Sequence, residues 1–201
     1  MTKTNNVQKM TRMAILIALT VILQNLPFRL GTVEMTLGII PVEIGAMLMG
    51  PTTGAILGTV MGIASFLQCL GIFVPSAFGA QLLSINPFLT LVLCIASRAL
   101  MGFLVGVIFR FLHRFDKTKV LSFGVAAVSG AVLNSLFFTT LVIAFFYNTD
   151  YIQAMAQGVG ANNVILFFFA FIGINGIVEA AVSFFVGGAS TKVLEKIVLH
   201  Y

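Results

Sequence analysis

Long runs of apolar residues, separated by short polar or glycine-containing connections, dominate the chain. A helix needs about 20 mostly apolar residues to cross the roughly 30 Å hydrocarbon core of a bilayer. Six runs of about this kind occur, at residues 10–26, 36–49, 52–74, 87–109, 120–146 and 164–188. The pattern predicts an all-α integral membrane fold, a bundle of six transmembrane helices that forms one membrane-embedded domain over residues 1–201. The second run is the shortest, and the Gly/Pro turn MGPTTG joins it to the third, which predicts a tight helical hairpin.

Composition and charge agree with a membrane location. Hydrophobic residues make up 59% of the chain and charged residues only 8%, too few for the surface of a soluble domain of this length. Nine of the eleven basic residues flank the first, fourth, fifth and last runs: Lys3, Lys9, Arg12, Arg110, Arg114, Lys117, Lys119, Lys192 and Lys196. By the positive-inside rule, both termini then face the cytoplasm. This basic rim also accounts for the net charge of +5 without a nucleic-acid partner.

Polar residues within the apolar runs gather in the outer half of the predicted bundle. Arg98, for example, lies roughly 18 Å from the cytoplasmic end of its run by the helical rise. The candidate binding residues are Arg98, Asn134, Asn175, Glu179, Gln68 and Asn86. Their distribution predicts a cavity that opens to the outside, and not a pore that crosses the membrane. The outer connections, at residues 27–35, 75–86 and 147–163, are expected to be polar loops, each of which is either a gate or part of a binding site, or a simple solvated linker.

Arg98 has two interpretations, because a charge inside a membrane needs a partner or a task. Glu179 is predicted at a similar depth, so the two side chains would neutralise each other in a purely structural pair. Alternatively, Arg98 holds an anionic ligand, because guanidinium binds a carboxylate through two hydrogen bonds and stays charged in an apolar site. Glu179 would then orient Arg98, and Asn134 and Asn175 would bind an amide or hydroxyl groups of the ligand.

Motifs for catalysis and metal binding are absent from the sequence. There is no GxxxxGK[ST] phosphate loop, no GxSxG elbow and no HExxH motif. His113 and His200 lie at the cytoplasmic rim, and Cys69 and Cys94 have no metal-ligand spacing, so the cysteines are read as small packing residues. We therefore expect neither an enzyme nor a metal site.

Small residues recur at four-residue spacing in two helices. The segment GPTTGAILGTVMG places Gly50, Gly54, Gly58 and Gly62 on one helical face, which lets a neighbouring helix approach closely. Ala14 and Ala18 have the same spacing in the first helix.

The chain resembles the substrate-binding S components of energy-coupling factor (ECF) vitamin transporters. The resemblance covers essentially the whole chain and rests on Ala14-xxx-Ala18, GIIPVEIGAMLMGPTTGAILG and INPFLTLVLCIASRALMG. It implies a multi-pass protein of the prokaryotic cell membrane that binds a vitamin in an outward-facing pocket. It also implies that the Ala14 and Ala18 face docks on a membrane-embedded coupling protein, which carries two cytoplasmic ATPases. ATP would be used by those subunits, and this chain would hold no cofactor.

The intramembrane arginine favours a vitamin that carries a carboxylate. Pantothenate fits best, with a carboxylate for Arg98, an amide and hydroxyls for Asn134 and Asn175, and a gem-dimethyl group for the aromatic-rich walls. The segment around Arg98 is also similar to that of pantothenate S components. Niacin and biotin keep the carboxylate contact, whereas pyridoxine or riboflavin would leave Arg98 to Glu179. A membrane scaffold with a structural Arg98–Glu179 pair is the alternative from outside transport.

Overall fold

The computed structural model of the chain describes residues 6–26, 28–30, 33–35, 37–116, 121–188, 190, 191 and 193. Within these ranges, the side chains of residues 6, 28–30, 33–35 and 174–179 are not described. The described part is almost entirely helical and includes one short antiparallel hairpin. Its elements are α1 (Asn6–Gln24), β1 (Phe28–Leu30), β2 (Val33–Met35), α2 (Ile39–Met49), α3 (Pro51–Cys69), α4 (Ala77–Ile85), α5 (Pro87–Phe115), α6 (Leu121–Phe146), α7 (Asp150–Gly158), α8 (Val164–Val182) and the π-helical segment η1 (Ser183–Gly188).

Each of the six predicted runs forms a helix, so the all-helical prediction is confirmed. By length and hydropathy, α1, α3, α5 and α6 are sufficient to cross a bilayer, whereas α2 and the first part of α8 are shorter apolar helices. The backbone of α8 departs from helical geometry at Gly173, where φ is −8° and ψ is −114°. Four described helices therefore qualify as candidate spans, and the count of six stays a prediction.

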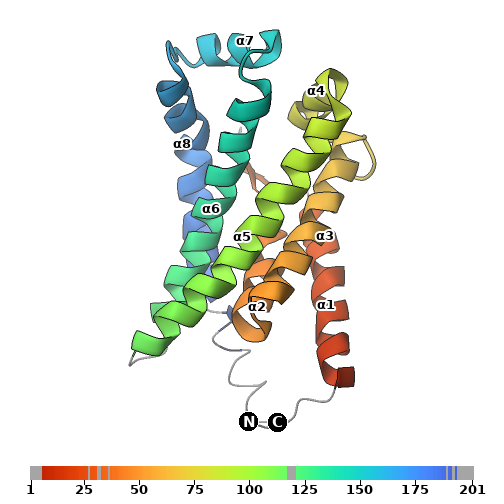
Figure 1. Cartoon of the computed structure of the whole chain (residues 1–201), viewed down its shortest axis with the longest axis vertical. Coiled ribbons are helices and arrows are strands. Elements are labelled where there is room, and N and C mark those ends of the chain that lie inside the picture. The colour runs from red at the N-terminus through yellow and green to blue at the C-terminus, as the bar shows by residue number, and fades with distance from the viewer. Residues whose placement is uncertain are drawn as a thin grey trace.

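The three connections that were predicted to face the outside contain more regular structure than the sequence predicted. In the first connection, β1 pairs with β2 so that Arg29 lies opposite Glu34. The other two connections contain the short helices α4 and α7 instead of loops alone. Ser76 precedes α4 as its N-cap, and its Oγ accepts a hydrogen bond from the backbone N–H of Gly79 at 3.1 Å. Figure 1 shows α4 and α7 at one end of the bundle, and the start of α1, the α2–α3 turn and the end of α5 at the other.

The glycine ladder of α3 packs directly on the backbone of α5, which confirms its predicted role. A Cβ atom added at Gly54, Gly58 or Gly62 would collide with a backbone carbonyl oxygen of α5, and the carbonyl that faces Gly58 belongs to Arg98. The α2–α3 turn needs glycine for a second reason, because Gly50 has a φ of 104°, a conformation that costs residues with a side chain. The helix that carries Arg98 is thereby held against α3 along its buried length.

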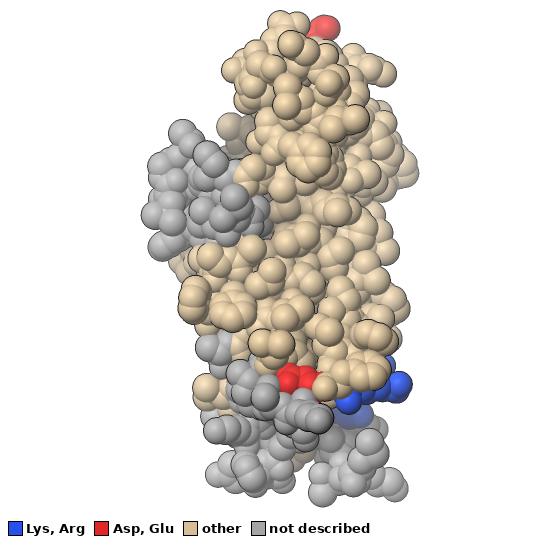
Figure 2. All heavy atoms as spheres, turned by 90° about the vertical axis from the view of Figure 1, so that its left-hand side faces the viewer, with Lys and Arg blue, Asp and Glu red and all other residues tan. Residues whose placement is uncertain are grey.

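The face of the bundle shown in Figure 2 is largely apolar between its two ends, as expected for a membrane location. On the face shown in Figure 2, basic atoms lie near the lower end, and the described surface between the two ends is free of charged atoms. α1 is the least buried candidate span, with 11% of its apolar window buried against 50% for α3. α1 therefore offers most of its surface to lipid or to a partner.

Candidate functional site

A cavity of about 430 Å³ lies between the helices in the half of the bundle that carries α4 and α7. This volume is in the range of small-molecule binding sites. The residues that line it come from α1, α3, α5 and α6, from the α4 and α7 helices and from the first part of α8: Gln24, Ser65, Gln68, Cys69, Ser76, Phe78, Gly79, Leu82, Thr90, Leu93, Cys94, Arg98, Asn134, Ser135, Phe138, Thr139, Met155, Phe171 and Ile172. Three of the predicted binding residues, Arg98, Asn134 and Gln68, therefore meet at one site.

Arg98 supplies a positive charge to the cavity wall. Its side chain is only 7% exposed, and its Nη1 donates a hydrogen bond to the Cys94 carbonyl at 3.2 Å. The guanidinium carbon lies 5.5 Å from the centre of the Phe138 ring, a cation–π arrangement. Its Nε is buried and has no hydrogen-bond partner. Among the described side chains, no carboxylate forms an ion pair with Arg98, so the guanidinium keeps donors and charge for an anion.

Asn134 brings an unused amide to the same cavity from α6. Its side chain is 7% exposed, and its Oδ1 is buried without a hydrogen-bond partner. An unsatisfied buried polar atom costs about 1–3 kcal/mol, and a ligand that donates a hydrogen bond would recover part of this. Ser135 and Thr139 lie on the same helix and add hydroxyl groups to the wall.

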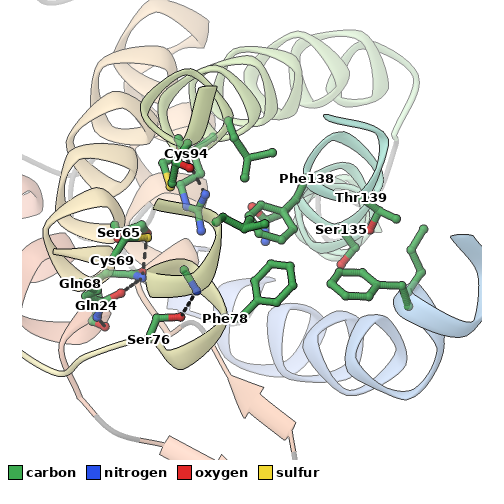
Figure 3. Close-up of a pocket in the computed structure, with 18 of the residues that line it drawn as sticks. Gln24, Ser65, Gln68, Cys69, Ser76, Phe78, Cys94, Ser135, Phe138 and Thr139 are labelled. Atoms are coloured by element: carbon green, nitrogen blue, oxygen red, sulfur yellow. Dashed lines mark hydrogen bonds between the residues drawn. The ribbon is translucent and has the colours of Figure 1, made fainter. Parts of the chain in front are cut away.

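An amide cluster connects the cavity to α1. Gln24 Nε2 donates to Ser65 Oγ at 3.1 Å and to Gln68 Oε1 at 3.2 Å. Gln68 Nε2 donates in return to the Gln24 carbonyl at 2.9 Å. Gln24 Oε1 is buried without a partner and faces Gly38 of the α2 N-terminus. Figure 3 shows these side chains on one side of the cavity and those of α6 on the other.

Aromatic rings form an apolar wall that the sequence did not single out. The Phe78 ring lies 6.2 Å from Phe138 and 5.6 Å from Phe171, measured between ring centroids. The rings come from α4, α6 and α8 respectively. The site therefore combines one cation, several amides and hydroxyls, and an aromatic surface, which suits a small amphipathic molecule with an anionic end.

The comparison with known families agrees with this geometry. The family model for the substrate-specific component of ECF transporters matches residues 8–187, a range that includes every residue that lines the cavity. The chain belongs to this family. ECF substrate-specific components are membrane transport subunits that bind a small-molecule substrate and associate with other ECF transporter components. A search of curated proteins finds no match to the chain.

The remaining predicted residues of this substrate-specific component have different positions. Asn86 does not line the cavity; its Oδ1 accepts a hydrogen bond from the Leu89 backbone N–H at 3.1 Å and so caps the start of α5. The Asn-Pro pair at a helix start was the signal for this role. Asn175 and Glu179 fall outside the described side chains, so the Arg98–Glu179 pair stays a prediction.

Ala14 and Ala18 lie exposed on α1. Nothing larger than a methyl group projects from these two positions, so a neighbouring helix could approach α1 closely there.

Proposed function

We propose that this ECF substrate-specific component binds a carboxylate-bearing vitamin in the cavity, and that the vitamin is pantothenate. The observation that carries the proposal is the Arg98 guanidinium, buried at the cavity wall with an unpartnered Nε and no ion pair among the described side chains. A carboxylate would supply both a hydrogen-bond acceptor and a counter-charge for this guanidinium.

The rest of the cavity supports pantothenate within this class. Its amide and hydroxyl groups would hydrogen-bond to Asn134, which keeps an unpartnered oxygen, and to the side chains of Gln24 and Gln68 that line the cavity. Its gem-dimethyl group would pack on the wall formed by Phe78, Phe138 and Phe171. Niacin and biotin would keep the carboxylate contact, whereas pyridoxine and riboflavin have none to offer.

The proposed membrane arrangement is six spans with both termini in the cytoplasm of a prokaryotic cell. Arg110 and Arg114 support it, since they lie at the end of α5 that is remote from the cavity, and basic residues favour the cytoplasmic side. The cavity would then face the outside. The chain would act as one domain without a cofactor or catalytic activity of its own.

The proposed partners are a membrane-embedded coupling protein and two cytoplasmic ATPases, which would use the ATP. The exposed face of α1 around Ala14 and Ala18 is the proposed docking surface, because two alanines four residues apart leave a smooth strip for close helix contact. Docking would then deliver the bound vitamin to the cytoplasmic side.

Calorimetric titration of the detergent-purified chain with each vitamin tests the proposal. We expect pantothenate to bind with a sub-micromolar Kd, and riboflavin and pyridoxine to show no binding. Tight binding of niacin or biotin in place of pantothenate would keep the carboxylate site and change the substrate. Tight binding of riboflavin or pyridoxine alone would refute the role given to Arg98, and no binding of any of the five would refute the vitamin site.

A further inference from the structure

Two cysteines that were predicted from the sequence to be packing residues lie together at the cavity wall. Cys69 ends α3 and Cys94 lies on α5, and both line the cavity. Both are free thiols, 7% and 3% exposed, and their side chains contact each other. Figure 3 shows them on the side of the cavity that also carries Ser65 and Gln68.

Rigid elements hold the two sulfur atoms together. At Gly62 the missing side chain lets α3 pack directly on the Cys94 carbonyl, which fixes the position of Cys94 relative to α3. The Cys69 Sγ donates to the Ser65 carbonyl at 3.2 Å, which turns the thiol back along α3. On the α4 side, Gly79 leaves the space that the Cys69 sulfur fills. The dithiol is therefore formed by the fold and does not depend on a rearrangement.

We propose that Cys69 and Cys94 form a binding site for a single soft, thiophilic atom, such as trivalent arsenic or a soft metal ion, bridged between the two sulfurs. Thiolates select soft centres, and the described residues contain no group of three or more His, Cys, Asp and Glu side chains that would complete a site for a metal needing more ligands. The pair therefore suits an atom that needs only two sulfur ligands from the protein.

Occupancy of this site blocks the vitamin site, a step that rests on the proposed function. Arg98 lies one helical turn beyond Cys94 and donates to its carbonyl, so an atom held by the two sulfurs and its substituents would project toward the place given to the vitamin carboxylate. With an organoarsenic oxide, each thiol loses its proton, two As–S bonds replace the As–O bond, and the oxygen leaves as water. Arsenic stays trivalent, so the step needs no oxidant or reductant.

The first experiment measures binding at the thiols without any vitamin. The purified chain is treated with phenylarsine oxide, and its intact mass and free thiols are determined. We expect one phenylarsenic group per chain, the loss of both thiols together, and release by a small competing dithiol. Cys69→Ala and Cys94→Ala each keep one thiol and are expected to retain the arsenical at least tenfold less well. Absence of the adduct in the unmodified chain, or equal retention by either variant, would overturn the site.

The second experiment measures the ratio of vitamin affinities with and without the arsenical, using whichever vitamin the chain binds. We expect at least a tenfold loss of affinity in the unmodified chain and a ratio near one in each single-cysteine variant. A ratio near one in the unmodified chain that carries the arsenical would overturn the blocking step and leave the dithiol site standing. Failure of pantothenate to bind would count against the proposed function only, because the mass measurement does not involve it.

Discussion

The contact between Arg98 and a ligand carboxylate can be tested by removing either partner. Pantothenol differs from pantothenate in having an alcohol in place of the carboxylate, and Arg98→Gln removes the charge while keeping a polar side chain. Arg98 is 7% exposed, so a charge pair about 4 Å apart at an effective dielectric constant near 20 is worth about 4 kcal/mol. Loss of hydration of the incoming carboxylate offsets part of this. We expect a net coupling of about 3 kcal/mol, within the range of close charge pairs at interfaces, which is about 100-fold in Kd.

Titration calorimetry of both proteins with both ligands measures this coupling. The unmodified chain is expected to prefer pantothenate over pantothenol by about 100-fold, and Arg98→Gln to bind the two ligands with similar affinity. Pantothenol binding by the variant serves as the control for folding, because it does not use the charge. If the variant still prefers pantothenate by more than tenfold, or if the unmodified chain does not discriminate, Arg98 does not bind the carboxylate.

Three further predictions concern packing, hydrogen bonding and docking. Gly58→Ala places a Cβ against a backbone carbonyl of α5 and is expected to destabilise the fold by about 1–3 kcal/mol, measured as a lower unfolding temperature in detergent. Gly158→Ala is the control, because a Cβ added at Gly158 would have nothing within 4 Å. Equal effects of the two substitutions would contradict the packing role of the glycine ladder. Asn134→Ala is expected to weaken pantothenate binding about tenfold. Asn86→Ala is expected to lower the stability of the fold by about 1 kcal/mol, because the helix cap is lost, and to leave the Kd for pantothenate unaltered. The reverse pattern would show that Asn86 binds the ligand and that Asn134 is structural. Ala14→Trp is expected to keep the Kd and abolish uptake into cells that contain the coupling module, so normal uptake would exclude this face from docking.

The helices, and the positions of Arg98 and Asn134 at the cavity, could be predicted from the sequence because a membrane restricts both backbone conformation and the placement of polar residues. A long apolar run has to form a helix there, since its backbone groups have no water to bind, and a polar residue inside such a run needs a specific environment. Arg98 and Asn134 stand out for this reason, and both line the cavity.

Contacts between helices were harder to predict, because a single run carries no information about the rotation of its neighbour. The aromatic wall depends on Phe78, which lies in a connection that was expected to be a loop and is part of α4. The Cys69–Cys94 contact joins helices whose relative height is set by the glycine ladder. Asn86 lies ahead of a proline, where its side chain caps α5, and this local role cannot be separated from ligand binding by depth in the membrane alone.

The glycine ladder also divides the cavity into a fixed side and an adjustable side. Carbonyl groups of α5 occupy the space that side chains would fill at the glycines of α3. Sliding or rotation of one helix against the other would bring these carbonyls into collision with neighbouring side chains. The cation on α5 therefore has its place before any ligand enters. Adjustment to an entering molecule falls to the opposite side, where α4 and α7 are helices of only 9 residues each and the backbone of α8 bends at Gly173. Recognition of the charge would thus be immediate, and the speed of entry and exit would be governed by the short helices that close over it.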